Sequence, residues 1–451
     1  MTHFRKLAAA AAGVAAALAS SGAFAAGFQL NEQSIVGMGR SYAGEGIMGD
    51  DVSAAWYNPA GLTLLPGTQI QVGGMDVELD LEYKGKDGGS ENGRKRSSPI
   101  LHQMMSRQFS DRLWGGLAFV MPYGLSTSYG ADWAQNQRGY DARLLAVTIN
   151  PSLAWKLTDK VSVGAGFQAQ HIDATVSMKK NVMGYGAYSR LEADDWGFGW
   201  NVGAMWEPTE TLRFGFGYRS QMNHNAHGHV KLTADSASQS GIQNLMKAAS
   251  ANSAIMSQLK ALAAQNGISS SALMSIASSG SMTLPGGANM KSPANANFTV
   301  VWKYSPKLRL SSTIRWTDWS SFDRLIITAG NLPHSSTDIP MKWRDTWFVS
   351  LGYDLDITPK WTIRGGVAYD RSPIKDARYR TAIIPDANRG WLSLGASYRL
   401  NDRWQFDLAA MHVHAFGNRD LYSDYTSSGE KVGHFKSLNS YLLGAGFVYR
   451  F

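Results

Sequence analysis

The sequence predicts an all-β membrane protein: a transmembrane barrel of about fourteen antiparallel strands with a plug formed by its N-terminal segment. Three observations lead to this fold class. Apolar and polar residues alternate with a period of two, glycine and aromatic residues are abundant (47 Gly, 15 Trp, 18 Tyr and 17 Phe), and no long apolar run follows the first 25 residues. A membrane-spanning helix needs a run of about 18 apolar residues, so the chain is expected to cross with strands.

Residues 1–25 are expected to be a signal peptide that is removed on export. Arg5 and Lys6 precede an Ala-rich apolar core from Leu7 to Ala19, and Ala23-Phe24-Ala25 places small residues where a signal peptidase reads. A membrane anchor is the alternative, but the apolar run is short for one. The chain contains no cysteine, which removes disulfides, thiol catalysis and thiolate metal sites.

The last segment of the chain gives the clearest strand pattern. From Tyr441 to Phe451 the odd-numbered residues are apolar or aromatic, whereas the residues between them include glycines and Arg450. Successive side chains of a strand point to opposite faces, so one face is expected to contact lipid and the other to face a wet lumen. Similar alternation begins at four earlier positions: Leu212, Trp347, Trp361 and Leu392.

Short turn sequences alternate with longer polar stretches between these segments. The short turns are expected on the periplasmic side and the longer stretches outside the cell. We therefore predict a barrel over residues 67–451, with long extracellular loops at 171–195 and 221–293. The terminal Phe451 resembles the C-terminal signal that the outer-membrane assembly machinery reads, so this machinery is an expected partner. The predicted turns are 157–160, 207–210, 305–307, 358–360 and 401–403.

Residues 26–66 do not alternate. They are rich in glycine and contain the run from Trp56 to Gly61 (WYNPAG), which indicates a compact irregular fold and not a strand. Irregular backbone is tolerated at membrane depth only where protein or a water-filled cavity surrounds it. We predict that this segment is a hatch, or plug, inside the barrel; a free periplasmic extension is the alternative.

The mature chain carries a series of motifs in a fixed order. AGFQLNE at 26–32, GRSYAGEG at 39–46 and NPA at 58–60 are similar to the N-terminal hatch of the FadL family. That family comprises outer-membrane long-chain fatty acid transporters and related aromatic-hydrocarbon channels. Other similar motifs are PYGL at 122–125, WGFGWN at 196–201, YRS at 218–220, WSSF at 319–322, DRSP at 370–373 and IPDANR at 384–389. The resemblance implies hatch residues that include Phe28, Asn31, Gly39, Asn58, Pro59 and Ala60.

The resemblance also implies a passive mechanism. In that family the hatch closes a fourteen-stranded barrel, an inward kink of the third strand opens a hole in the wall, and the substrate leaves sideways. Here the kink would fall at Pro122, Tyr123 and Gly124. Independently, proline cannot donate to a strand ladder and glycine permits a bulge. The alternative is that Pro122 ends its strand near the outer rim. No cofactor or energy source is required.

The insertion at 221–293 carries apolar residues near helical spacing. Among them, Leu245, Met246, Met256 and Leu259 are expected to form an adaptable apolar groove that captures the ligand. The segment 171–195 is expected to be its partner. The alternative is a cap that only packs on neighbouring loops.

Two positions depart from the fatty-acid transporters, which place basic residues near the pocket to meet the carboxylate. By alignment these positions are Asp173 and Ile326 here. Either Arg190, Lys179 or Arg324 compensates, or the ligand is not a fatty acid. A fatty acid and an aromatic hydrocarbon therefore both stay open, and a detergent is a further expected ligand.

Other features predict no chemistry. The cluster Arg94-Lys95-Arg96 is expected to face lipopolysaccharide or other anionic outer-membrane lipid; an ordinary solvated loop is the alternative. The positive charge is too dispersed for nucleic-acid binding. His224, His227 and His229 have no neighbouring carboxylate or cysteine, so no metal site is predicted. No spacing specifically brings a serine and a histidine together, and we predict a monomeric, non-enzymatic protein without catalytic residues. The alternative functions are a hydrophilic porin and a surface adhesin or phage receptor.

Overall fold

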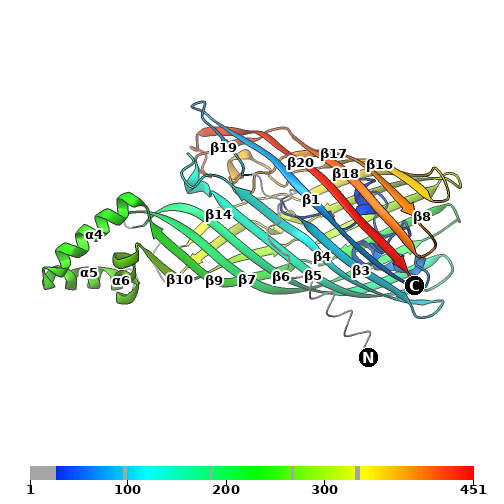
Figure 1. The fold of residues 1–451 in the computed structure, drawn as a ribbon, viewed down its shortest axis with the longest axis horizontal. Helices are drawn as coiled ribbons and strands as arrows, with labels where there is room; N and C mark the ends of the chain where they lie inside the picture. The colour runs from blue at the N-terminus through cyan, green and yellow to red at the C-terminus, as the bar shows by residue number, and fades with distance from the viewer. Residues whose placement is uncertain (1–26, 95–98, 183–184, 266–268, 331–335) are drawn as a thin grey trace.

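The computed structural model describes residues 27–451 except 95–98, 183–184, 266–268 and 331–335, so the expected signal peptide lies outside the described residues. Fourteen strands form a closed antiparallel barrel, as the sequence predicts, and the last of them pairs with the first (Figure 1). In wall order they are β1 (Thr68–Gly85), β3 (Ile100–Gln108), β4 (Leu113–Ser128), β5 (Asp141–Lys156), β6 (Val161–Val182), β7 (Tyr185–Trp206), β8 (Leu212–Arg219), β11 (Asn295–Lys303), β12 (Leu308–Thr317), β15 (Thr346–Asp356), β16 (Trp361–Asp370), β17 (Asn388–Arg399), β18 (Trp404–Phe416) and β20 (Lys431–Arg450).

The short turns predicted from the sequence gather at one end of the barrel, where the C-terminus also lies (Figure 1). We term this the turn end and the opposite end the loop end. At the loop end, six further strands lengthen the wall, and three helices between β9 and β10 project beyond it. The strands are β2 (Ser90–Asn92), β9 (Met222–Ala234), β10 (Ser281–Ser292), β13 (Arg324–Ala329), β14 (Thr337–Pro340) and β19 (Asp420–Tyr422), and the helices are α4 (Ser236–Ser250), α5 (Ser253–Gln265) and α6 (Ser270–Ser279).

The prediction of two long loops is wrong for many of their residues, which form strands. The segment 171–195 is not a loop, because β6 runs to Val182, β7 starts at Tyr185, and the two strands pair over their full length. The insertion 221–293 likewise begins and ends in the paired strands β9 and β10, and only its middle is helical. Antiparallel pairing satisfies the backbone N–H and C=O groups that a loop would leave to water, so the strands continue beyond the lipid.

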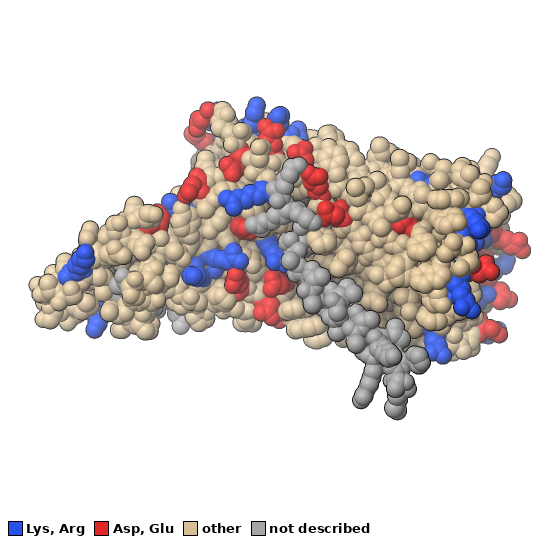
Figure 2. Space-filling model, in the orientation of Figure 1, with Lys and Arg blue, Asp and Glu red and all other residues tan. Residues whose placement is uncertain are grey.

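The outward side chains of the wall form an apolar belt. The alternation predicted for the last strand is present, since Tyr441 and Leu443 are 50% and 69% exposed whereas Leu442 is buried. Figure 2 shows charged side chains at the turn end and over the loop end, with a nearly uncharged band between them. No helix in the described part of the chain is long and apolar enough to cross a membrane. The belt has the composition expected of a wall that contacts membrane hydrocarbon.

Candidate functional site

Residues 27–66 lie inside the barrel, and nearly all of them are buried (Figure 1). We term them the hatch segment. A Cβ on Gly39 would lie 2.9 Å from the Cα of Gly395 in β17, so only glycine lets the segment approach the wall this closely. Segment and wall therefore pack as one unit. The segment contains three short helices: α2 (Ile35–Met38), α3 (Ala54–Tyr57) and the 3₁₀ helix η1 (Pro59–Leu64).

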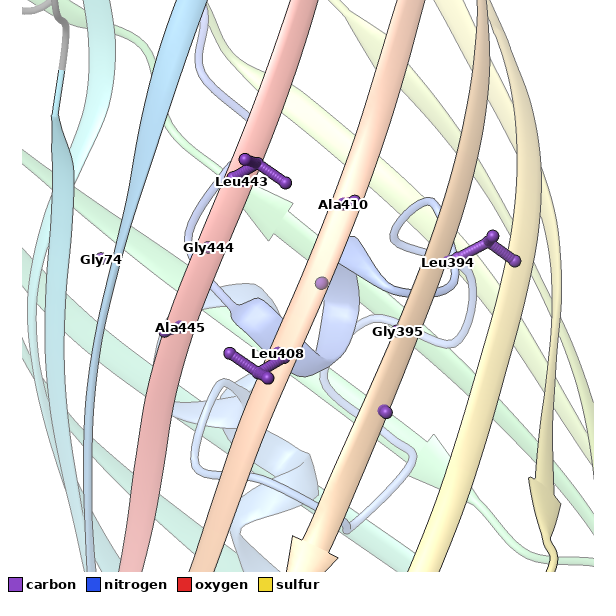
Figure 3. Close-up of a pocket in the computed structure, with 10 residues that line it drawn as sticks. Gly74, Leu394, Gly395, Leu408, Ala410, Leu443, Gly444 and Ala445 are labelled. Carbon is purple, nitrogen blue, oxygen red and sulfur yellow. The ribbon is translucent and has the colours of Figure 1, made fainter.

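The outer surface over this contact is a groove of about 710 Å³. Figure 3 shows Leu394, Leu408 and Leu443 around small wall residues, with the hatch segment behind them. These three leucines are 62%, 64% and 69% exposed. The groove therefore faces lipid and belongs to the belt.

Asn58 anchors the hatch segment to two wall strands. Its side-chain amide donates to the carbonyls of Ala204 in β7 and Phe216 in β8, each at 3.2 Å. Its Oδ1 accepts from the Ala60 N–H at 3.1 Å, and Pro59 starts η1, where its missing N–H is tolerated. The Asn58-Pro59-Ala60 motif thus lies at the contact between hatch segment and wall.

Replacing Asn58 with alanine is expected to weaken docking of the hatch segment by about 1–3 kcal/mol, because a buried hydrogen-bonding site loses its donor. Single-channel conductance in planar bilayers should rise, while heat-modifiable electrophoretic mobility should still report a folded barrel. Thr63→Ala is the matched control, because Thr63 bonds Ser162 of the wall at a partly exposed position where water can replace it. Wild-type conductance in Asn58→Ala would show that this anchor does not hold the segment.

A buried ion network joins the hatch segment to the wall on the turn side. Arg40 contacts Asp50 of the same segment at 2.7 Å and Asp354 of β15 at 3.4 Å, and Arg364 of β16 contacts Asp354 at 2.9 Å. Burial acts to raise the pKa of Asp50, but Arg40 and Arg364 outweigh it and hold that pKa below its usual range. These charges balance one another only while the hatch segment is docked.

Beyond this network, a polar funnel of about 860 Å³ lies at the turn end of the barrel. Its lining is mainly polar or charged, so it is a poor environment for an apolar ligand. The charged residues of its lining are Asp50, Lys303, Lys307, Arg309, Asp356, Lys360, Arg364, Arg399, Asp402 and Arg450.

The ladder of β4, the third strand of the wall, is irregular at the predicted kink. Its register with β5 shifts between Val120 and Tyr123, so two residues of β4 oppose the single residue Val147. From Val120 to Ser128 both faces of the strand are buried, which places this part of β4 inside the lipid-facing wall. The strand continues past Pro122, so the alternative that this proline ends it is wrong.

The kink also interrupts pairing with β3. β3 pairs with β4 only as far as Phe119, and the N–H of Leu101 donates to the Sδ of Met121 at 3.4 Å instead of to a carbonyl. Nearer the loop end, the Arg94 N–H donates to the Ser128 carbonyl. We term the stretch of β4 between these points the interrupted wall. Among the described residues, no wall strand pairs with this stretch on the β3 side; side chains and the start of the hatch segment cover it.

The start of the hatch segment pairs with the free edge of β4. The Leu30 N–H donates to the Pro122 carbonyl at 2.8 Å, and the Gly124 N–H donates to the Phe28 carbonyl at 2.9 Å. The ring of Phe28 is buried among four aromatic rings at centroid distances of 4.8–6.0 Å. Phe28 therefore closes the lumen at the height of the kink. The four rings are those of Tyr123, Trp319, Phe322 and Trp343.

Asn31 and Glu32 continue the segment into the barrel. The Asn31 carbonyl accepts from the Tyr57 hydroxyl at 2.5 Å, and its side chain accepts a hydrogen bond from Arg315 of β12. Burial raises the pKa of Glu32 to about 7, although the charge of Arg389 opposes this. Arginines of the wall therefore compensate the buried polar groups of this part of the segment: Arg315 bonds Asn31, and the charge of Arg389 acts on Glu32.

On the loop side of Phe28, the inside of the barrel holds a large cluster of buried apolar side chains. Many membrane barrels have a polar interior, so this lining is a specific feature that favours a hydrophobic ligand. Several members are methionines, whose flexible side chains adapt to different shapes. We term this set the apolar cluster; its larger non-aromatic members are Leu125, Leu144, Ile172, Met178, Leu191, Val230, Leu232, Met282, Leu284, Met290, Leu325, Ile327, Ile339, Met341, Ile374, Ile383 and Ile384.

Sequence comparison matches residues 16–451 to the family described as "Outer membrane protein transport protein (OMPP1/FadL/TodX)". The chain belongs to this family. The protein is therefore an outer-membrane transport protein of a Gram-negative bacterium, as the motifs predict.

FadL-type relatives and structures match the chain over nearly its whole length. The long-chain fatty acid transport protein of Escherichia coli O6:H1 is 27% identical and the 47 kDa outer membrane protein of Pasteurella multocida is 28% identical, each over 97% of both chains. A FadL homologue of Pseudomonas aeruginosa superposes with a TM-score of 0.78 at 23% identity, covering 94% of this chain and 100% of that one. The toluene transporter TodX of Pseudomonas putida superposes with a TM-score of 0.67 at 15% identity, covering 94% and 99%. The two structures support the fold.

The residues expected to capture ligand in this FadL-type protein lie on the projecting helices. Leu245 and Met246 belong to α4, and Met256 and Leu259 belong to α5. Leu245 is exposed and the other three are partly exposed. The helices pack on one another, and α4 also contacts β7. The four residues therefore lie beyond the loop end and away from the hatch segment (Figure 1).

The two positions aligned with basic residues of the fatty-acid transporters, Asp173 and Ile326, do not face the lumen in the structure. Asp173 is exposed while its neighbour Ile172 is buried, so Asp173 faces away from the lumen. Ile326 likewise alternates with buried Leu325 and Ile327 and lies on the outer face. Neither residue faces the apolar cluster, because a strand sends neighbouring side chains to opposite sides.

The three basic residues expected to compensate are each paired with a carboxylate. Arg190 contacts Glu192 at 2.7 Å, Lys179 contacts Asp235 at 3.1 Å and Arg324 contacts Asp338 at 3.1 Å. All three pairs lie at the loop end, where water screens them. None of them offers an uncompensated charge to a ligand in this FadL-type barrel.

The other polar clusters do not form a site. His224 is buried and bonded to Gln170, whereas His229 is half exposed and contacts Glu192, so the three histidines do not converge. Among the described residues, no group of three or more potential metal ligands is present. Arg94 is exposed, and Lys95 and Arg96 lie outside the described residues.

Sequence reasoning missed two parts of this FadL-type site. Met121 was not identified as the side chain that closes the interrupted wall, and no local signal marks it. The alternation places Arg219 and Arg213 on the same polar face of their strand, but nothing in the sequence shows that the two arginines have different partners.

Proposed function

We propose that this FadL-type protein is a passive channel for hydrophobic small molecules, long-chain fatty acids or aromatic hydrocarbons. The ligand is captured at the loop end by the projecting helices, moves into a pocket within the apolar cluster beside the hatch segment, and leaves sideways through the interrupted wall. The apolar cluster is the observation that carries this proposal. Relatives named for transport of long-chain fatty acids and a structural neighbour named for toluene support the ligand class.

Sideways release is supported by the chemistry of the two possible exits. A route straight through the barrel passes the Arg40–Asp354 network and then the charged funnel at the turn end. A route through the interrupted wall passes Met121 and Leu101 and ends in membrane lipid. An acyl chain gains about 0.8 kcal/mol per CH₂ buried in lipid, so the sideways route is downhill without an energy source.

The two other candidate functions have less support. A hydrophilic porin needs an open polar lumen, whereas Phe28 and the hatch segment fill this one. A surface adhesin or phage receptor would use only the loop end and gives no role to the apolar interior. Such a receptor role is compatible with transport.

A disulfide between hatch segment and wall tests the route. The Oγ atoms of Ser41 and Ser393 lie 2.8 Å apart, so cysteines at both positions are well placed to bond. The chain has no other cysteine, so the pair cannot form a wrong disulfide within it. Locked and reduced proteins are expected to take up oleate or toluene at the same rate, because sideways release does not require the body of the hatch segment to leave the barrel.

Uptake would be measured in cells that rely on the variant, with gel-shift labelling of free thiols to report the locked fraction. The single variants Ser41→Cys and Ser393→Cys are the controls. A locked protein that stops uptake and recovers on reduction would contradict sideways release and favour passage through the barrel.

A further inference from the structure

A small polar cavity lies beside residues 29–31, between the hatch segment and the kink. It measures about 20 Å³, enough for one water-sized group. Pro122 and Tyr123 of the kink line it on one side, and Arg219 at the end of β8 lines it on another. It therefore adjoins both the floor of the apolar cluster and the proposed exit. Its lining also includes Asn31, Asn297 and Arg315.

Arg219 is a buried cation without a carboxylate partner. It is 7% exposed, and among the described residues no carboxylate oxygen lies within 4.0 Å of its nitrogens. Its Nη2 donates to the Trp56 carbonyl at 2.6 Å, its guanidinium lies 3.1 Å from the centre of the Trp56 ring, and its Nε has no hydrogen-bond partner. The Oδ1 of Asn297 in the same cavity also has no partner.

Other buried arginines of the interior differ from Arg219. Arg213, six residues earlier on the same strand face, is bonded to Glu207, and Arg364 is bonded to Asp354. Arg315 in the cavity is bonded to Glu45. The cavity thus holds two guanidinium groups and one carboxylate partner, which leaves one positive charge uncompensated.

We infer that Arg219 receives the carboxylate of an amphiphilic ligand at the exit, so that the transported class is long-chain monocarboxylates. This inference rests on the proposed function. A guanidinium presents a planar fork of donors that matches a carboxylate, and burial strengthens such a pair because water does not compete. The carboxylate would neutralise Arg219 as the Gln29–Asn31 stretch moves aside, while the chain of the ligand stays in the apolar cluster. Selectivity for the headgroup then lies at the kink and not at the loop end.

The test compares oleate with oleyl alcohol, which has the same chain and no charge. Binding of each to the full-length protein in lipid nanodiscs would be measured by calorimetry at pH 8. We expect the wild-type protein to prefer oleate, and Arg219→Gln to lose about 10- to 100-fold in oleate affinity while its affinity for oleyl alcohol is unchanged. Arg219→Lys should recover part of the preference, because it restores the charge without the fork.

Arg213→Gln is the matched control. Arg213 lies on the same strand face, is 8% exposed and, like Arg219, donates to carbonyls of the hatch segment, but it is already paired with Glu207. Its replacement should leave the preference for oleate intact. Arg219→Gln protein that still prefers oleate, or wild-type protein that binds both ligands equally, would overturn the inference and leave the proposed function standing. Wild-type protein that binds neither ligand would overturn the proposed function itself.

A second measurement does not depend on the variants folding. The carboxyl carbon of ¹³C-labelled oleate reports its ionisation by its NMR shift. Oleate bound to the wild-type protein is expected to stay ionised at lower pH than oleate in vesicles, because a nearby cation favours the charged form. Equal titration in both settings would show that only water occupies the cavity, and the inference would be wrong.

Discussion

Deleting Pro122 is expected to abolish uptake of hydrophobic ligands while the barrel still assembles. The deletion leaves one residue of β4 opposite Val147, so the ladder between Val120 and Tyr123 becomes regular. A regular β4 can continue its pairing with β3 past Phe119, and a continuous ladder leaves no interval through which a ligand can pass. Uptake of labelled oleate should fall to the level of cells that lack the protein.

Pro151→Val is the matched control for this deletion. Pro151 is also a proline within a strand, but it lies in β5 opposite Leu117, where the ladder is regular, and it faces lipid. Surface level and heat-modifiable mobility should be the same for both variants and the wild-type protein. Normal uptake after deletion of Pro122 would place the exit elsewhere.

Replacing Arg40 with alanine is expected to give the largest loss of stability. Asp50 and Asp354 then lose a shared cation, and breaking a buried ion pair from one side costs about 3–5 kcal/mol because a charge stays buried without a partner. The hatch segment should undock, so the variant should conduct ions in planar bilayers as a steady open pore. Urea unfolding in lipid vesicles would measure the loss of stability.

Arg309→Ala is the control for this prediction. Arg309 contacts Asp356 at 2.8 Å at the edge of the same network, where both side chains are partly exposed. Water can solvate Asp356, and the buried Asp354, 3.9 Å from Arg309, keeps its closer partners Arg40 and Arg364. The expected loss is therefore below about 1 kcal/mol, and conductance should stay low. If Arg40→Ala and Arg309→Ala behaved alike, the buried network would not be what holds the hatch segment.

The barrel could be predicted from the sequence because its main signal is local. The alternation from Tyr441 to Phe451 follows from the geometry of a strand and needs no knowledge of its neighbours. The kink at Pro122 and the irregular fold around Asn58 are also local, since proline and glycine act on their own backbone. The extent of the strands was not predictable in the same way. Residues 171–195 are polar enough for a loop, and only pairing of β6 with β7 makes them strands.

By itself, the sequence determined a barrel of about fourteen strands and the two-residue alternation that gives each strand an outward and an inward face. Only the tertiary structure decided that Phe28 closes against rings nearly 300 residues away and that, among the described residues, Arg219 has no carboxylate partner while Arg213 has one. The physical reason is that the face of a residue follows from the two-residue period of its own strand. The partner of a charge or a ring is set only when the barrel closes around the hatch segment, because closure brings together residues from the whole length of the chain.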